Sequence, residues 1–141
     1  MQITLTSESL AWQQAVRKYV DNTLVPQEVA TEMNGGELPA EIMRDIHDQA
    51  VQLGLPGMDT PSEHGGLGLG MVDQVVAWEA LGRVTNALCW CFPEAQSWMY
   101  EACGASEFQL ETYIRPLLEG RRREAYAITE AESGSHEVIN S

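Results

Sequence analysis

The feature that most constrains this chain is a single strand-like run close to its C-terminus. Residues 125–129 are mostly small or β-branched, and they follow a long region in which apolar residues recur at helical spacing. A strand normally pairs with other strands, because an unpaired apolar edge invites aggregation. No other strand-like run is present to pair with it, so residues 124–141 are expected to belong to a larger structural unit.

The spacing of apolar residues predicts an all-α domain of five or six helices over residues 1–123. Residues 124–141 are then the start of a β-domain that is truncated in this chain. Capping residues, terminal glycines and interrupting prolines set the predicted bounds of the helices. The first helix begins at Thr6 or Ser7 and ends or kinks at Pro26, and a short turn follows over 27–34. Further helices are predicted from Pro39 to Gly54, from Met71 to Val84, from Ala87 to Cys103, and from Ser106 onward with a break at Pro116.

A loop rich in glycine and proline, residues 55–70, separates the second and third long helices. Its last six residues, Gly65-Gly66-Leu67-Gly68-Leu69-Gly70, invite comparison with phosphate-binding loops. However, the loop lacks the Lys and Ser/Thr of a P-loop, follows no strand, and would need a glycine at Met71 to match the dinucleotide-binding fingerprint. We therefore predict a structural loop whose glycines allow positive φ or close packing.

The charge balance of the chain is strongly acidic. Eight Lys and Arg residues against 21 Asp and Glu residues give a formal net charge of −13. This balance argues against nucleic acid as a partner, because phosphate binding needs a basic face. Three cations adjoin one another at Arg121-Arg122-Arg123. A solvated turn before the strand is the favoured interpretation of this run, and a phosphate clamp is the alternative.

The cysteines and the N-terminal stretch bear on the cellular compartment. The 3 cysteines form no C-x-x-C pair, and the first residues lack the basic and apolar regions of a signal peptide. No apolar run approaches the roughly 20 residues needed to span a bilayer. We expect reduced thiols, a cytoplasmic location and no membrane span.

The titratable side chains give no metal or catalytic pattern. His47, His64 and His136 are isolated from other ligand types at metal spacing, and His47 is expected to be solvated at a helix edge. Glu79 stands on an otherwise apolar helix, so it needs a partner. The residue four positions later, Arg83, is the predicted partner in a structural ion pair.

Two other segments carry side chains that could meet a ligand. The first is an aromatic group for which a place in the core is favoured over a pocket for an apolar ligand: Trp90, Phe92, Trp98 and Tyr100. The second begins at Thr129, at the end of the strand, and continues into the turn Ser133-Gly134-Ser135. Hydroxyls and backbone N–H groups on one side of such a loop suit the polar edge of a ring or a phosphate.

Four segments, taken in order, carry a family resemblance. They are Leu53 to Gly57 with Pro61-Ser62-Glu63-His64-Gly65-Gly66-Leu67-Gly68, then Trp78-Glu79-Ala80-Leu81-Gly82-Arg83, then Tyr113-Ile114-Arg115-Pro116-Leu117-Leu118-Glu119-Gly120, and finally Tyr126 to Ser135. Together they resemble the N-terminal region of the acyl-CoA dehydrogenase family of flavoproteins. Because the order and spacing hold across essentially the whole chain, the resemblance is more specific than any one motif.

The resemblance implies a fold and a reaction. In this family an all-helical N-terminal domain precedes a central β-domain and a C-terminal helical bundle. The family removes a proton from the α-carbon of an acyl-CoA thioester and passes the β-hydride to FAD, which then reduces an electron-transfer flavoprotein. The resemblance therefore implies FAD as cofactor, acyl-CoA as substrate, an electron-transfer flavoprotein as partner of the complete enzyme, and a homo- or hetero-oligomer.

The individual flavin and CoA contacts implied by the resemblance all lie in the last motif. By position, Thr129 would contact the flavin ring, and Tyr126 and Ile128 would lie along its edge. Gly134 and Ser135 would contact the flavin or the CoA portion of the substrate. The stretch from Ala87 to Pro93 would form a wall of the acyl pocket.

Departures from the family pattern leave three readings open. Ala131, Ser133 and His136 stand where the family motif has Pro, Ala and Asp, and the family's catalytic glutamate and most FAD contacts belong to later domains. No residue of this chain is therefore assigned as catalytic base or metal ligand, and the chain alone is expected to bind FAD weakly or not at all and to be inactive. The chain is read as one wall of an acyl-CoA dehydrogenase site. The alternatives are an inactive split subunit or interaction module, and a fragment of an acyl-CoA oxidase, nitroalkane oxidase or flavin monooxygenase on the same scaffold.

Overall fold

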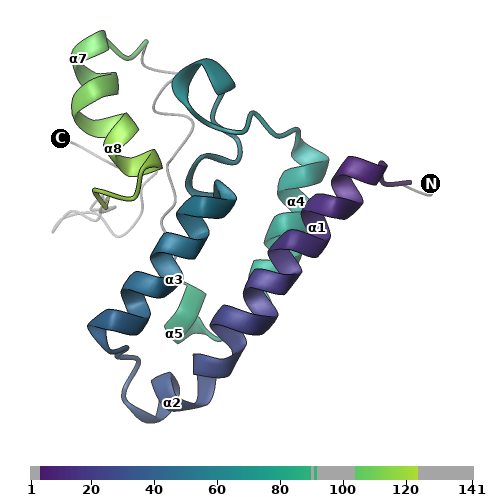
Figure 1. The fold of residues 1–141 in the computed structure, drawn as a ribbon, viewed down its shortest axis with the longest axis vertical. Helices are drawn as coiled ribbons and strands as arrows, with labels where there is room; N and C mark the ends of the chain where they lie inside the picture. Colours follow the sequence, from purple (N-terminus) through teal and green to yellow (C-terminus); the bar gives the residue numbers. More distant parts are fainter. Residues whose placement is uncertain (1–3, 90, 92–103, 124–141) are drawn as a thin grey trace, which may run out of the picture.

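The computed structural model describes residues 4–89, 91 and 104–123, and every regular element in these ranges is helical (Figure 1). The prediction of an all-α fold is therefore confirmed for these ranges. The predicted strand at residues 125–129 and most of the helix predicted over 87–103 lie outside them. The elements are α1 (Ser7–Tyr19), a π-helical turn (Val20–Leu24), a 3-10 turn (Val25–Gln27), α2 (Glu28–Met33), α3 (Ala40–Leu53), 3-10 turns at Leu55–Gly57 and Ser62–His64, α4 (Met71–Leu81), α5 (Asn86–Cys89), α7 (Glu107–Gln109), a second π-helical turn (Leu110–Ile114) and α8 (Arg115–Leu118).

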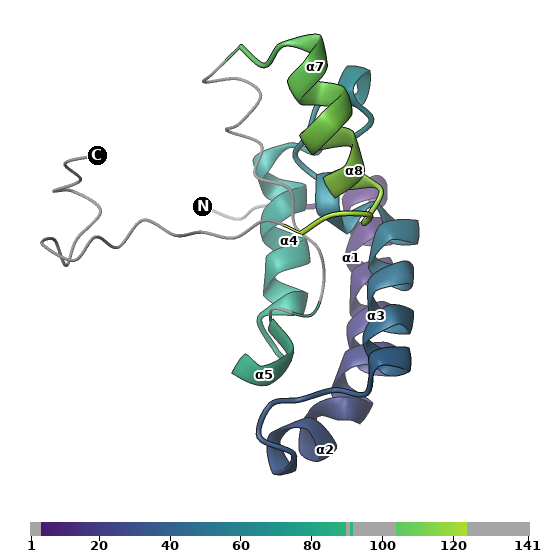
Figure 2. The ribbon, with the colours of Figure 1, turned by 90° about the vertical axis from the view of Figure 1, so that its left-hand side faces the viewer.

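Helices α1, α3 and α4 form the body of the domain. α1 packs along α4 and also contacts α3 (Figures 1 and 2). α2 lies at the end of the body where the chain turns from α1 to α3, and it contacts α5. α7 and α8 lie at the opposite end, beside the loop that joins α3 to α4. This loop and α8 together form the end of the domain from which the chain leaves toward residue 124.

Local sequence signals account for most helix bounds. The Thr6 hydroxyl accepts a hydrogen bond from the Ser9 N–H at 3.0 Å and so caps α1. Gly54 terminates α3 as predicted, with its N–H bonded to the Val51 carbonyl. Ser106 and Gln109 form a capping box at the start of α7, which confirms the predicted helix start at Ser106.

The two prolines predicted to disturb helices do so in a mild form. α1 passes at Val20 into a π-helical turn, and Pro26 then lies in the short 3-10 turn that leads to α2. Pro116 lies in the first turn of α8, directly after the second π-helical turn. A proline is tolerated in a first turn because its missing N–H would have no helical partner there. The chain therefore continues in helical form past Pro116 rather than breaking.

The core lies between α1, α3 and the inner side of α4, and it is completed by residues of α5. The largest fully buried side chains include Val16, Leu24, Ile46, Leu81 and Leu88. Burying these apolar surfaces supplies most of the stabilisation expected of such a domain.

One polar group in the core has a defined partner and an altered acidity. The Tyr19 hydroxyl donates to the Ile46 carbonyl at 3.1 Å and so ties α1 to α3. Burial raises the pKa of the Tyr19 phenol above its ordinary value, and Cys91 and Asp45 add to the effect. Tyr19 is therefore neutral in the folded protein up to strongly alkaline pH.

Helix α4 is apolar on two sides. Its inner side, Val76, Ala77, Ala80 and Leu81, is buried. Its outer side exposes Met71 (72%), Val72 (47%), Val75 (56%) and Trp78 (38%). A helix that is apolar all round is usually buried on both sides. Within the described ranges, no helix has both the length and the hydrophobicity needed to cross a membrane.

Candidate functional site

The residues predicted to contact the flavin lie outside the described part of the chain. They are Tyr126, Ile128, Thr129, Gly134 and Ser135, and their roles remain predictions. The aromatic group of Trp90, Phe92, Trp98 and Tyr100 also lies outside it. The described residues therefore test the surroundings of the predicted site: the glycine-rich loop, the charged side chains and the end of the domain next to residue 124.

The glycine-rich loop is folded onto itself. Its Leu67, Gly68 and Leu69 N–H groups donate to the carbonyls of Gly57, Thr60 and Met58 at 2.8, 2.8 and 2.7 Å. A phosphate-binding loop instead aims its N–H groups at the ligand. Because these donors are used within the loop, it is a structural loop, as predicted, and it does not fit the phosphates of FAD.

Close packing explains the glycine at position 66. A Cβ atom built on Gly66 would lie 2.1 Å from the Thr60 carbonyl oxygen, which no real side chain tolerates. On the same loop, a Cβ on Gly57 would lie 2.5 Å from a methyl group of Leu118 in α8. The loop thus joins α3 to α4 and also packs against α8.

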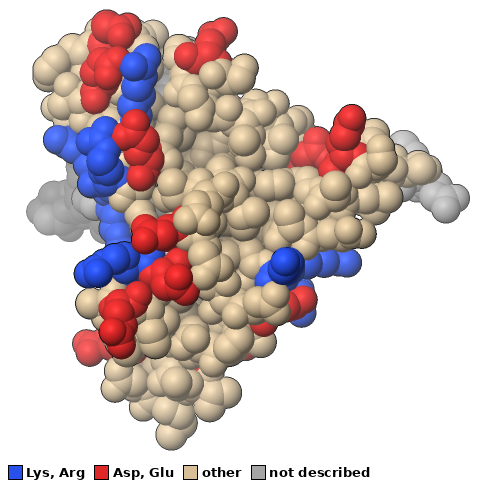
Figure 3. Space-filling view, in the orientation of Figure 1, with Lys and Arg blue, Asp and Glu red and all other residues tan. Residues whose placement is uncertain are grey.

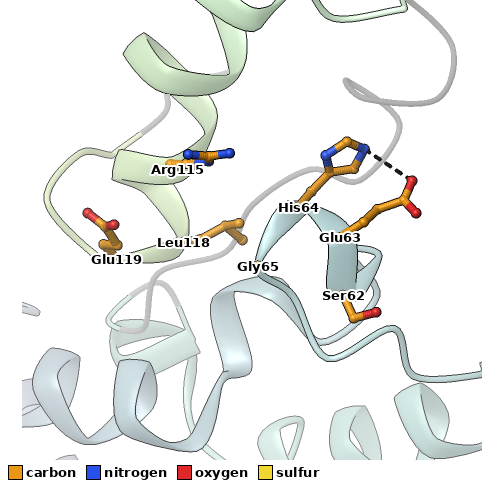
Figure 4. A pocket seen from close by; sticks show the side chains of 7 residues that line it. All are labelled: Ser62, Glu63, His64, Gly65, Arg115, Leu118 and Glu119. Carbon is orange, nitrogen blue, oxygen red and sulfur yellow. Dashed lines mark ion pairs between the residues drawn. The ribbon is translucent and has the colours of Figure 1, made fainter.

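A shallow hollow of about 310 Å³ lies between α8 and the Ser62–His64 turn (Figure 4). Two carboxylates and two basic side chains line it. The His64 imidazole lies 3.7 Å from the Glu63 carboxylate, while Arg115 pairs with Glu111 and Glu119 pairs with Arg121. Each carboxylate therefore has a basic side chain beside it, and the hollow offers neither a lone carboxylate nor a site for a ligand of single-sign charge. It is lined by Ser62, Glu63, His64, Gly65, Arg115, Leu118 and Glu119.

The predicted ion pair between Glu79 and Arg83 is wrong. Glu79 is exposed and lies 3.4 Å from Arg17 of α1, while Arg83 lies 2.8 Å from Asp21. α4 packs along α1, so acid and base meet across the two helices rather than four residues apart on one. These exposed pairs contribute little to stability, about 0–1 kcal/mol each.

The prediction that His47 is solvated is also wrong. Only 14% of its side chain is exposed, although the neighbouring Asp48 carboxylate, 3.9 Å from Nδ1, is open to solvent. The ring packs against Gly120, which follows α8. Helix periodicity could place His47 at an edge but could not show that a segment distant in sequence covers that edge.

The arginine run behaves as a solvated turn, as predicted. Arg121, Arg122 and Arg123 are exposed. Arg121 pairs with Glu119, and the Arg122 guanidinium lies 5.4 Å from the centre of the Tyr113 ring. Figure 3 shows acidic and basic side chains interleaved along one edge of the molecule rather than gathered by sign. Nothing in this arrangement makes a phosphate clamp.

The cysteine and histidine side chains show no metal centre in the described ranges. Cys91 is buried, and its sulfur lies 3.5 Å from the Ala87 carbonyl oxygen, to which the thiol donates. Among the side chains that the structure describes, no three from His, Cys, Asp and Glu come together in a metal-binding group.

Comparison with known proteins places the chain in a family. The sequence-family model of the acyl-CoA dehydrogenase N-terminal domain matches residues 6–121. Isovaleryl-CoA dehydrogenase of Bos taurus is 28% identical over 95% of the chain, which corresponds to 31% of that protein. Acryloyl-CoA reductase (NADH) of Anaerotignum propionicum is 30% identical over 96% of the chain and 33% of that protein. Another relative, at 26% identity over 84% of the chain and 31% of that protein, is the caffeyl-CoA reductase-Etf complex subunit CarC of Acetobacterium woodii.

The fold agrees with that assignment. The structure of an acyl-CoA dehydrogenase complexed with FAD from Bacillus anthracis matches 94% of this chain with a TM-score of 0.74 and 25% identity, and 22% of that solved chain is covered. The chain thus spans about a third of the length of the curated relatives. The helical fold, the family match and the four motifs agree, and the chain belongs to the acyl-CoA dehydrogenase family, whose N-terminal domain it contains.

Proposed function

We propose that this chain forms one wall of the acyl-CoA and flavin site of an FAD-dependent acyl-CoA dehydrogenase. The single observation that carries the proposal is the agreement of its fold with an acyl-CoA dehydrogenase complexed with FAD over 94% of the chain. The match of residues 6–121 to the N-terminal domain of the family supports the same assignment.

The outer side of α4 supports a role as part of a larger site. Met71, Val72 and Val75, with the partly exposed Trp78, form an apolar strip on the outer side of α4. Exposed strips of this kind mark surfaces that pack against other polypeptide. This chain matches about a third of the length of these relatives, and we assign the covering of α4 to the equivalent of their other two thirds.

The roles of individual residues follow from this assignment. When bound, FAD supplies the acceptor for the hydride that leaves the β-carbon of the acyl thioester. We propose that Thr129 bonds the flavin ring, that Tyr126 and Ile128 flank it, and that Gly134 and Ser135 contact the flavin or the CoA portion of the substrate. The described glycine loop takes no part in this binding, since its donors are already used. The reaction's base is assigned to polypeptide beyond this chain.

The redox partner and the compartment are part of the same proposal. One relative is named as a subunit of a reductase–Etf complex, which supports an electron-transfer flavoprotein as partner of the complete enzyme. The buried thiol of Cys91 and the absence of a disulfide pattern in the sequence support a reducing compartment, and we propose the cytoplasm.

The exposed strip on α4 also supports a second candidate function. An inactive subunit that docks onto a partner carrying the remaining domains would also leave this strip exposed when isolated. The two candidates differ in whether the assembled protein turns over acyl-CoA, and not in the fold of this chain.

A chimera tests the proposal. Residues 1–141 would replace the matched N-terminal part of the Bacillus anthracis enzyme, with circular dichroism used to confirm folding. We expect the chimera to elute with FAD and its flavin absorbance to bleach anaerobically with short-, medium-, long- or branched-chain acyl-CoA. A folded chimera that holds FAD but is bleached by none of them would favour the inactive subunit. A folded chimera without FAD would contradict the assignment to the flavin site.

A further inference from the structure

The end of the molecule that holds α7 and α8 exposes two aromatic rings. Phe108 is 67% exposed and Tyr113 is 49% exposed, and their ring centres lie 6.1 Å apart in an edge-to-face arrangement. The Arg122 guanidinium lies over the Tyr113 ring. Aromatic rings and arginine are enriched at protein–protein interfaces and contribute much of their binding energy. These three side chains, the aromatic face, therefore have the composition of a docking surface.

The same end of the molecule has an excess of positive charge. Its two ion pairs, Arg115 with Glu111 and Arg121 with Glu119, are each neutral. Arg122 and Arg123 have no carboxylate partner within the described ranges. A partner of the aromatic face should therefore present apolar side chains together with negative charge.

α2, at the opposite end of the molecule, presents that combination (Figures 1 and 2). Val29 is 77% exposed and Met33 is 84% exposed, and residues four apart lie on the same side of a helix. Glu32 is exposed beside them and has no ion-pair partner among the described residues. We call Val29, Glu32 and Met33 the α2 face.

The sequence around α2 makes this end negative throughout. Between Lys18 and Arg44 there is no Lys or Arg. Asp21 in this interval pairs with Arg83. The other acidic residues of the interval are Glu28, Glu32, Glu37 and Glu41.

We propose that the aromatic face of one copy of this chain docks onto the α2 face of a second copy. Phe108 and Tyr113 would cover Val29 and Met33, and Arg122 would meet Glu32. One copy cannot pair the two faces by itself, because they lie at its opposite ends. The contact is head-to-tail, so every added copy leaves one face of each kind free, and assembly continues unless a ring closes.

Sedimentation velocity of the purified chain at increasing concentration tests the pairing of the two faces. We expect a series of growing oligomers. Phe108→Ser and Met33→Ser should each weaken the association at least about tenfold, as the loss of a central interface side chain does. An equimolar mixture of the two variants should form dimers and nothing larger, because it keeps one intact pair of faces. Val75→Ser, at a 56% exposed apolar position on α4, is the matched control and should leave the association unchanged.

A charge exchange tests the polar part of the contact. Glu32→Arg and Arg122→Glu should each weaken the association, because each brings like charges together at the contact. Their equimolar mixture should restore it, since opposite charges then meet again. Added salt should weaken the association of the unaltered chain, because exposed charges are screened.

Three results would overturn the inference. The first is a chain that stays monomeric at every concentration. The second is association that Val75→Ser abolishes and Phe108→Ser does not, which would make the outer side of α4 the contact. The third is loss in Met33→Ser that the mixture with Phe108→Ser does not rescue, which would indicate that α2 pairs with a second α2. Circular dichroism confirms the fold of each variant, and the charge exchange decides the question if a serine variant fails to fold. Flavin has no part in these measurements, so their outcome stands whether or not the chimera holds FAD.

Discussion

Helices α3 and α4 are neighbours in the sequence, yet they differ in how their surfaces are used. α3 buries Ile46 and Ala50 in the core and turns Glu41, Arg44 and Asp48 to solvent. α4 buries its inner side equally well, but its outer side exposes an apolar strip. α3 is therefore complete within this domain, whereas α4 has the composition of a helix that is covered on both sides.

This difference separates what stabilises the domain from what the domain offers to other polypeptide. The inner sides of both helices stabilise the fold, and substitutions there should be costly in the isolated chain. The outer side of α4 contributes little to the isolated fold, and its value should appear only when further polypeptide covers it.

The largest expected effects come from the two inner sides. Leu81→Ala in α4 and Ile46→Ala in α3 each remove a fully buried side chain and should lower the free energy of unfolding by about 2–5 kcal/mol. Urea denaturation measures both. Val29→Ala, at a position that is 77% exposed, should change stability by less than about 0.5 kcal/mol. A cost below about 1 kcal/mol for Leu81→Ala would show that α4 is not anchored as described.

The loop between the two helices should be the next most sensitive region. Gly66→Ala brings a Cβ into the Thr60 carbonyl and should cost about 1–3 kcal/mol, as overpacking does. Gly70→Ala is the matched control, because nothing lies within 4 Å of a Cβ there and its φ is −67°. Equal thermal midpoints for the two variants would refute the close packing that joins α3 to α4.

The Tyr19 bond from α1 to α3 predicts a smaller, pH-dependent effect. The pKa of Tyr19 is raised in the folded state above its ordinary value of 10.0, so the unfolded chain ionises first. Its contribution to stability is complete below pH 10 and is lost as the pH rises above that value. Tyr19→Phe should lower the free energy of unfolding by about 0.5–1.5 kcal/mol near neutral pH. It should also remove the part of the stability loss above pH 10 that is due to Tyr19. An alkaline stability profile for Tyr19→Phe identical to that of the unaltered chain would contradict the assignment.

The smallest effect on the isolated chain should come from the outer side of α4. Val75→Ser should change its stability by less than about 0.5 kcal/mol. In the chimera with the Bacillus anthracis enzyme, where we expect this side to be covered, the same substitution should lower stability measurably more. An equal effect in both proteins would mean that the strip stays exposed after assembly and would remove the difference between α3 and α4.

Much of the fold was predictable because its signals are local. The stripe of α3, its end at Gly54 and the capped start at Ser106 depend on residues within one or two turns of each other. The partner of Glu79 and the environment of His47 depend instead on how distant helices pack. Helical spacing alone could not choose Arg17 over Arg83, nor bring Gly120 onto α3.

The candidate site was predictable only through the family resemblance. From the residues alone, Thr129 and the Ser133-Gly134-Ser135 turn indicate a loop with polar groups on one side, which many ligands would suit. The proposal of a flavin as ligand came from the family resemblance, and the family match over residues 6–121 supports that resemblance. The positions that would contact the flavin lie outside the described ranges, so their roles stay predictions.

The most direct test of the central claim is gel filtration of the purified chain with added FAD, monitored in the visible range. If the chain is one wall of a site that needs further polypeptide, flavin will elute separately from a folded, helical protein, because a flavin site needs groups from several elements. Flavin that co-elutes with the chain, with shifted absorbance bands, would show that this chain builds a flavin site by itself and would contradict the account.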